Sequence, residues 1–321
     1  MTGREHRGTI FVEDAEVRGH QEFPGRQYVI RLHAPRCAAA AVPGSFAHLS
    51  CDAELPMRRP LSIMLANATA GTIDILYKVV GPGLDKLSRQ RVGTRLSLLG
   101  PIGRGFTTST DRPRSLLIGG GVGIPPMIFL ADALRRRTDA RWQPLVLMGS
   151  EIPFPFRARP STLLIRGMPA GVIAGMPLLE DWGVPSRLAS LAGYPGCYEG
   201  YVTALAEVWL ATLEPQALGE TVIYACGPTP MLKAVAGLAR RYGVPAQVSL
   251  EEFMACAVGG CAGCAVPVLI DGALAMKRVC VDGPVFDADA VFPAGTLPFS
   301  GNESQDPRAV DRKRGASPSR S

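Results

Sequence analysis

Four cysteines in the last quarter of the sequence constrain this chain more than any other feature. Cys256, Cys261 and Cys264 have the spacing C-x4-C-x2-C, and Cys280 follows after a gap of fifteen residues. Small residues permit a tight loop in which sulfur atoms turn inward while backbone N–H groups come close to them. The small residues here are Ala255, Ala257, Gly259, Gly260, Ala262 and Gly263. The segment is therefore predicted to bind a metal centre through its thiolates.

The distribution of the cysteines about the gap separates two kinds of metal centre. Three close thiols and one distant thiol match the plant-type spacing of [2Fe–2S] proteins. Backbone N–H groups near the sulfur atoms would also stabilise negative charge and tune the potential. A structural zinc site, the alternative, usually pairs two short knuckles, one from each side of a loop. The pattern therefore favours a [2Fe–2S] cluster on Cys256, Cys261, Cys264 and Cys280.

Length and cysteine usage define the general class of protein. A chain of 321 residues is longer than one core usually fills, so two or three domains are expected. The polar start, residues 1–14, lacks the apolar core of a signal peptide. Apolar stretches are broken by Gly and Pro before the about 18 residues that a membrane span needs. We expect a cytoplasmic protein without a membrane span, and the presence of eight cysteines in such a chain favours metal or redox chemistry over a disulfide framework. Cys37, Cys51 and Cys197 are isolated and are expected to be ordinary thiols.

The formal net charge is +6, and five basic residues lie in the second half of the polar tail, residues 287–321: Arg308, Arg312, Lys313, Arg314 and Arg320. A basic tail could contact nucleic acid or a membrane surface, but such tails are more often solvated and disordered. No nucleic-acid-binding motif accompanies it. We therefore expect a disordered tail and no nucleic-acid partner.

The first hundred residues read as short strands separated by turns. Residues 27–33, 71–80 and 95–99 are rich in β-branched and aromatic residues, and the first two partly alternate. A short helix is expected at residues 84–89, after a Gly-Pro-Gly turn. Strands at this spacing without a long helix predict a small antiparallel barrel.

Three ordered pieces of this region suit a flavin or a pyrophosphate. Arg59 could pair with a phosphate and Ser62 could add a hydroxyl hydrogen bond. The turn at residues 81–83 would let backbone approach a flat ring, and residues 100–103 close the domain. Each piece also occurs in ordinary loops, but the ordered set favours a cofactor site.

The pattern changes at residue 114 to strands that alternate with helices. A buried-strand run at 115–118 is followed by a glycine-rich turn and a helix at 125–137, and 221–225 and 230–242 repeat the order. This alternation predicts a parallel sheet.

The turns that follow two of these strands are candidates for a dinucleotide site. A helix N-terminus favours the negative charge of a pyrophosphate, and ligands of open α/β sheets lie beyond the carboxyl ends of strands. The glycine turn does not have the G-x-G-x-x-G spacing. Cys226 could lie near a nicotinamide ring or, as the alternative, serve packing. The candidate residues are Gly119, Gly120, Gly121, Gly123, Cys226, Gly227 and Pro228.

Taken in order, these pieces resemble the ferredoxin–NADP⁺ reductase superfamily, and within it the electron-transfer subunit of B-type dihydroorotate dehydrogenase. The most telling segment is the cysteine loop closed by Cys280-Val-Asp-Gly-Pro284. The resemblance covers residues 8–286 and also includes the segments 59–62, 77–83, 100–103, 119–126 and 224–228.

The resemblance implies an α+β multidomain fold. An N-terminal antiparallel β-barrel (residues 8–110) would bind FAD, a central α/β parallel-sheet domain (111–250) would bind NAD(H), and residues 251–286 would form the [2Fe–2S] domain, followed by the tail. The sequence departs from the family at Leu84, where Thr is common. The implied FAD contacts are Arg59, Pro60, Leu61, Ser62, Leu76, Tyr77, Lys78, Gly83 and Leu84.

The resemblance also implies a function in pyrimidine biosynthesis. Electrons from dihydroorotate, oxidised on a separate FMN-containing dihydroorotate dehydrogenase catalytic subunit, would pass through the cluster and FAD to NAD⁺. The two chains would form a hetero-oligomer, a heterotetramer by family likeness. No catalytic triad or carboxylate pair is found in this chain, so no catalytic acid–base residue is expected.

Two alternatives remain open. Related subunits with the same three domains serve sulfide dehydrogenase or electron-bifurcating NADH-dependent ferredoxin:NADP⁺ oxidoreductase. A metal-stabilised regulatory module that binds a nucleotide without turnover is the alternative from another class.

Overall fold

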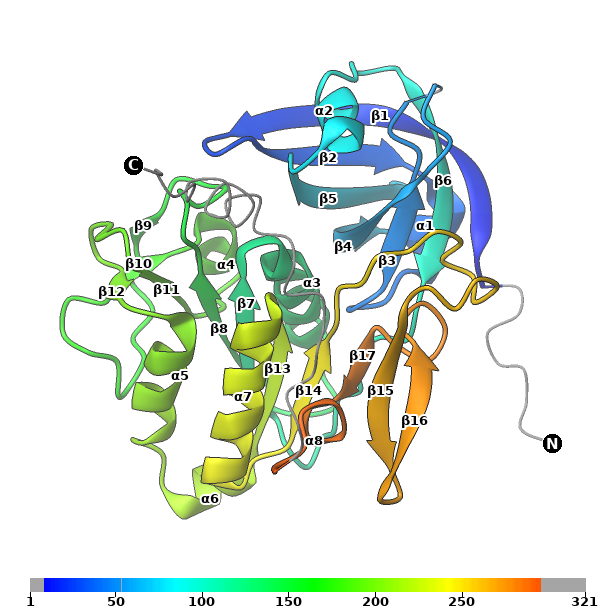
Figure 1. The fold of residues 1–321 in the computed structure, drawn as a ribbon. Helices are drawn as coiled ribbons and strands as arrows, with labels where there is room; N and C mark the ends of the chain where they lie inside the picture. Colours follow the sequence, from blue (N-terminus) through cyan, green and yellow to red (C-terminus); the bar gives the residue numbers. More distant parts are fainter. Residues whose placement is uncertain (1–8, 53, 296–321) are drawn as a thin grey trace, which may run out of the picture.

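The computed structural model describes residues 9–52 and 54–295 of the chain. A barrel and a helix-covered sheet lie side by side, and a two-stranded hairpin projects next to both (Figure 1). Across the described residues, no helix is long and apolar enough to cross a membrane.

The first part of the described chain folds as a closed antiparallel barrel with strand order β1-β2-β5-β4-β3-β6. Side chains alternate between solvent and the interior, where Ile30, Leu32, Ile73 and Ile75 are fully buried. Residues 59–62, for which no element was predicted, begin β4. The barrel elements are β1 (Phe11–Phe23), β2 (Gln27–His33), α1 (Pro35–Ala40), β3 (Phe46–Leu49), β4 (Arg59–Asn67), β5 (Thr72–Lys78), α2 (Pro82–Ser88) and β6 (Arg95–Ile102).

The second part is a sheet with strand order β12-β11-β8-β7-β13-β14-β17 in the described residues. The strands are parallel except β17, which pairs antiparallel with β14. Its strands are β7 (Arg114–Gly120), β8 (Gln143–Gly149), β11 (Ser186–Ser190), β12 (Tyr198–Glu199), β13 (Thr221–Cys226), β14 (Ala246–Ser249) and β17 (Val285–Asp287). The predicted fold class, a barrel followed by a parallel-sheet domain, is confirmed.

Helices cover both faces of this sheet. Leu116 and Ile118 of β7 pack with α5 and α7 on one face, whereas Leu117 packs with α3 on the other. Helix α3 also contacts β4, so it lies between the sheet and the barrel, where Met127 and Met64 share one apolar cluster. The helical elements are η1 (Gly121–Gly123), α3 (Ile124–Arg135), α4 (Pro177–Asp181), α5 (Val202–Leu210), α6 (Pro215–Gly219) and α7 (Thr229–Tyr242).

The stretch between β8 and α5, which the sequence left unassigned, is held by a buried arginine. The Arg187 side chain donates hydrogen bonds to the carbonyl oxygens of Val172 at 2.9 Å and Leu163 at 2.7 Å. These bonds join loops that contain only the short strands β9 (Arg159–Pro160) and β10 (Ala174–Gly175). Long-range bonds of this kind leave no periodic pattern in a sequence.

The cysteine segment leads into a hairpin of β15 (Ala265–Ile270) and β16 (Ala273–Arg278). Val266 and Val268 pack into the same core cluster as α5 and α7, so the segment has no separate core. The expectation of a tail that starts at residue 287 is wrong for its first residues. Asp287 ends β17, and Ala288–Val291 forms α8, which packs on α7 and β15. The rest of the predicted tail, 296–321, lies outside the described residues.

The predicted domain limits stay predictions. The barrel strands end at Ile102 and the sheet begins at Arg114, so the predicted limit at 110 falls in the connection. Strand β17, which follows the cysteines, returns to the sheet of the second part. The chain thus leaves the sheet after β14, forms the cysteine segment, and returns to the same sheet as β17.

Candidate functional site

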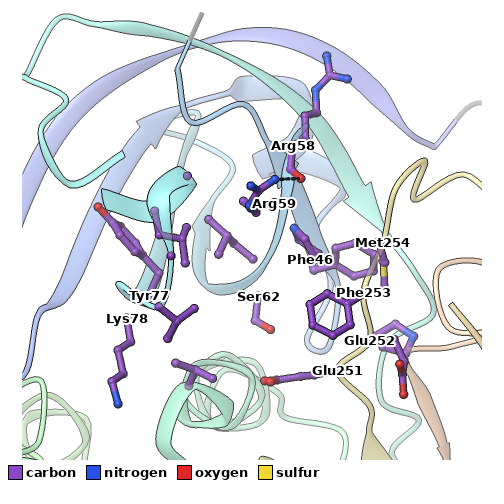
Figure 2. A pocket seen from close by; sticks show the side chains of 18 of the residues that line it. Phe46, Arg58, Arg59, Ser62, Tyr77, Lys78, Glu251, Glu252, Phe253 and Met254 are labelled. Atoms are coloured by element: carbon purple, nitrogen blue, oxygen red, sulfur yellow. Dashed lines mark hydrogen bonds between the residues drawn. The ribbon is translucent and has the colours of Figure 1, made fainter. Parts of the chain in front are cut away.

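A cavity of about 830 Å³ lies where the barrel, the α/β part and the cysteine segment meet. The barrel supplies one wall, residues 249–255 supply another, and Val122 and Thr229 reach it from the sheet turns (Figure 2). The nine predicted flavin residues all line this cavity: Arg59, Pro60, Leu61, Ser62, Leu76, Tyr77, Lys78, Gly83 and Leu84. The structure thus brings together residues from β4, β5 and α2, and their assignment to FAD stays a prediction.

Arg59 starts β4 and lies over the first turn of α2. Its Nη1 donates to the carbonyl oxygens of Met57 at 2.9 Å and Arg58 at 3.2 Å, which fixes the guanidinium (Figure 2). A Cβ on Gly83 would come within 2.9 Å of Arg59 Nε, so a larger residue there would displace the guanidinium. Arg59 is therefore held at the cavity wall, where its planar fork could bind a phosphate.

Tyr77 lines the cavity, but its hydroxyl group forms a hydrogen bond on the side that faces away from the cavity. The phenol oxygen lies 2.7 Å from His20 Nε2, while His20 Nδ1 lies 2.9 Å from the carbonyl oxygen of Gln90. A carbonyl only accepts, so Nδ1 carries the proton and, in the neutral ring, Nε2 accepts from Tyr77. The Tyr28 ring stacks on Tyr77 with centroids 5.5 Å apart. Burial raises the pKa of Tyr77 far above its usual value.

At position 84, where the family commonly has threonine, this chain has a leucine. Its side chain is buried beside Leu87 in the core cluster of the barrel. It also lines the cavity. An apolar contact therefore stands where a threonine would offer a hydrogen bond.

The two turns predicted to bind a dinucleotide are in direct contact. A Cβ on Gly123 would overlap the carbonyl group of Cys226, and one on Gly120 would come within 2.5 Å of Met231 Sδ. Gly121 has a φ of 55°, in the left-handed region that favours glycine. Gly123 is thus required by the packing of η1 against the end of β13, and Gly121 by its backbone conformation. None of the seven predicted positions lines the cavity, whereas Val122, in the same glycine turn, does.

The thiol of Cys226 is fully buried in the apolar cluster around α3. Burial raises the pKa of this thiol well above its usual value, with a smaller contribution from the charge of Glu251. The structure shows Cys226 packed behind the cavity wall, as in the alternative prediction, and its place near a nicotinamide ring stays a prediction.

Glu251 is a cavity residue that the sequence analysis missed. Its side chain points into the cavity on the side of Ser62 (Figure 2). It keeps accessible surface toward the cavity but is otherwise surrounded by protein, and this desolvation raises the pKa of its carboxyl group. Its position directly after β14, at the carboxyl edge of the sheet, is the signal that could have identified it.

The cysteine loop is shaped to direct N–H groups at sulfur. The Cys261 N–H donates to Cys256 Sγ at 3.4 Å, and the Gly263 N–H donates to Cys261 Sγ at 3.5 Å. Ala257 and Ala262 have φ values of 54° and 55°, in the left-handed region that few non-glycine residues adopt and that bulky or β-branched residues avoid. The loop therefore has the tight turns predicted from its small residues.

The fourth cysteine meets the loop from the hairpin side. Cys264 Sγ and Cys280 Sγ are 3.4 Å apart, and both thiols are buried. Burial and the neighbouring Cys264 raise the pKa of Cys280 to about 12. Burial acts in the same direction on Cys256, but backbone N–H groups of Val258 and Cys261 outweigh it and lower that pKa to about 7.

The four thiols are compatible with a [2Fe–2S] cluster rather than with a single zinc ion. Within the described ranges, no three His, Cys, Asp or Glu side chains converge closely enough to surround one metal ion. The four thiols and the N–H groups aimed at sulfur suit a cluster with thiolate ligands, whose potential such hydrogen bonds tune. The predicted cysteines therefore fit a [2Fe–2S] cluster, and their ligand assignment stays a prediction.

Comparisons with known proteins agree with this geometry. Residues 251–292 match the family model of the iron–sulfur cluster binding domain of dihydroorotate dehydrogenase B. The dihydroorotate dehydrogenase B (NAD(+)) electron transfer subunit of Desulforamulus reducens is 32% identical over 277 residues, which cover 86% of this chain and 96% of the relative. The corresponding subunit of Shouchella clausii is 35% identical over 253 residues, with 78% and 86% covered.

Solved structures share the fold. The NADH-dependent reduced ferredoxin–NADP oxidoreductase structure superposes with a TM-score of 0.67 at 25% identity, over 91% of each chain. The ferredoxin reductase of carbazole 1,9a-dioxygenase gives a TM-score of 0.55 at 24% identity, over 74% of this chain and 67% of that one. Fold and site thus define a reductase of the ferredoxin–NADP⁺ reductase type with an iron–sulfur-binding segment.

Within that class, the chain belongs to the family of dihydroorotate dehydrogenase B (NAD(+)) electron transfer subunits. The predicted family and the predicted cofactors, a [2Fe–2S] cluster, FAD and NAD(H), are confirmed. The match to an iron–sulfur domain also decides against zinc.

Proposed function

We propose that this chain is the electron-transfer subunit of a dihydroorotate dehydrogenase B. In this role it passes electrons released by oxidation of dihydroorotate through its cluster and flavin sites to NAD⁺. The names of its relatives and the iron–sulfur domain support this function over the alternatives in sulfide oxidation, electron bifurcation or regulation.

The observation that carries the proposal is the continuity of the cavity with the cysteine loop. The cavity that contains the nine predicted flavin residues is also lined by residues 251–255 and by Gly263, which adjoins Cys264. A flavin held there would lie against the segment that holds the cluster. FAD, when bound, exchanges single electrons with an iron–sulfur centre and a hydride with nicotinamide.

The chain itself contributes binding and orientation. In this proposal Arg59 and Ser62, which line the cavity on β4, hold the flavin, and the buried Tyr77 ring forms the wall at β5. Val122 of the glycine turn and Thr229 of α7 also line this cavity. A nicotinamide that approaches from these turns would meet the flavin inside the cavity.

The finer details of the partner are also part of the proposal. The partner is an FMN-containing catalytic subunit on which dihydroorotate is oxidised, and the two chains assemble as a heterotetramer. Its support is the family to which this chain belongs.

The test is anaerobic co-expression of this chain with its genomic neighbours, followed by purification through a tag on this chain. The proposal predicts a co-purified FMN protein, a visible flavin and iron–sulfur spectrum, and NADH formation from dihydroorotate and NAD⁺. A large flavoprotein with further clusters as the sole partner would contradict the pyrimidine role, and zinc without flavin would contradict the redox role.

A further inference from the structure

Arg278 joins the two parts of the cysteine set. It is the last residue of β16, two positions before Cys280. Its Nη1 donates to the carbonyl oxygen of Gly259 at 2.8 Å, within the loop that carries the other three cysteines. One side chain thus connects the Cys280 strand to the middle of the Cys256–Cys264 loop.

The backbone of the same residue shapes the turn that holds Cys280. The Arg278 N–H donates to Asp282 Oδ2 at 2.8 Å, and the Arg278 carbonyl oxygen accepts from the N–H groups of Val281 at 3.0 Å and Asp282 at 2.8 Å. Displacement of Arg278 would therefore move Cys280 and the loop together.

Gly259 lies close to the side chains of Val281 and Arg278. Gly259 has a φ of 81°, and a Cβ there would come within 2.5 Å of Val281 Cγ2 and 3.3 Å of Arg278 Nη1. The loop can lie this near to the guanidinium only because residue 259 is glycine.

The positive charge of Arg278 is only partly neutralised. Asp282 is the carboxylate in reach, but its Oδ2 lies 3.9 Å from Arg278 Nε, at the limit of an ion pair. Both side chains keep solvent contact, at 42% and 27% exposure, which weakens the pairing further. The guanidinium therefore lies closer to the cysteine loop, through Nη1, than to its carboxylate partner.

We infer that Arg278 is a positioning residue that clamps the cysteine loop and, through its charge, favours the reduced state of the bound cluster. An iron–sulfur cluster on four thiolates is anionic and gains one more negative charge on reduction, so a nearby cation stabilises the reduced form. This inference rests on the proposed function, because it concerns the cluster on that electron path.

The test is a redox titration of the purified chain with its cofactors, followed by the EPR signal of the reduced cluster. Arg278→Gln removes the charge and the fork, Arg278→Lys keeps the charge, and Lys277→Gln is the matched control. Lys277 is a cation in the same strand whose side chain faces the opposite side of the hairpin.

Arg278→Gln is expected to lower the midpoint potential, with electron affinity reduced about tenfold, or about 59 mV for a one-electron couple. Arg278→Lys should retain most of the potential, and Lys277→Gln should match the unsubstituted chain. If Arg278→Gln loses its cluster while Lys277→Gln keeps it, the clamp is supported. The charge is then tested by Arg278→Lys, which lacks the fork but keeps the charge and should therefore keep the midpoint potential.

Equal potentials for Arg278→Gln and the unsubstituted chain, or an equal shift in Lys277→Gln, would overturn the inference. The absence of an EPR signal from the unsubstituted chain, even after reconstitution, would instead overturn the proposed function. The two failures are therefore distinguishable.

Discussion

At the scale of single residues, the site depends on polar groups whose partners lie away from the cofactor cavity. Tyr77 turns its hydroxyl to His20 and presents its ring to the cavity. The Arg59 guanidinium is likewise held in place, because its Nη1 donates to two backbone carbonyl oxygens. The partner of Tyr77 is 57 positions away in sequence, so the motif predicts that this side chain lines the cavity but not what holds it.

The Tyr77–His20 bond gives a prediction at this scale. His20→Phe leaves the buried Tyr77 hydroxyl without its acceptor, which costs about 1–3 kcal/mol of stability and weakens FAD binding. Flavin release measured by fluorescence during thermal unfolding should occur at a lower temperature.

The double variant His20→Phe/Tyr77→Phe is the control, because it removes both partners and should lose less than the single His20 variant. A single variant that retains flavin as well as the unsubstituted chain would show that the bond does not position Tyr77.

At the scale of elements, the accurate predictions are those with a regular local pattern. Strand β2 and helix α7 were predicted to within a residue or two because their apolar patterns are regular. Strands β3 and β4 were missed, since β3 is short and buried at every position and β4 contains Pro60. The cavity residues on β4 were found through the family motif instead, whereas Phe46 on β3 was missed. Glu251 was missed because its role depends on where β14 ends in space.

The packing of the glycine turn against β13 gives a prediction at the scale of elements. Gly123→Ala would place a methyl group on the Cys226 carbonyl, so η1 and the end of β13 must move apart. NADH-to-dye activity should fall with a raised KM for NADH, while bound FAD remains. Gly237→Ala in α7 is the control, because nothing lies within 4 Å of its Cβ and alanine favours a helix by about 1 kcal/mol. An unchanged KM in Gly123→Ala would contradict a nucleotide site at this turn.

At the scale of the whole molecule, three parts of the chain meet at one cavity. The barrel, the parallel sheet and the cysteine segment each contribute to its lining, and β17 returns the chain to the sheet after Cys280. The order of the parts was predictable from motifs, whereas this return was not, because a three-residue edge strand has no pattern of its own. The shared core means that the cysteine segment is held rigidly against the α/β part. We therefore expect the cluster to be necessary for electron exchange with the partner but not for exchange between NADH and flavin.

The measurement that tests this central claim most directly compares two activities of Cys261→Ser. In the complex with the catalytic subunit, the variant should lose NAD⁺ reduction by dihydroorotate and the EPR signal of the cluster. The same protein should keep its flavin and its NADH-to-dye activity, because Cys261 is exposed and lies outside the flavin wall. Retention of dihydroorotate-driven NAD⁺ reduction without a cluster, or loss of FAD together with the cluster, would contradict the account.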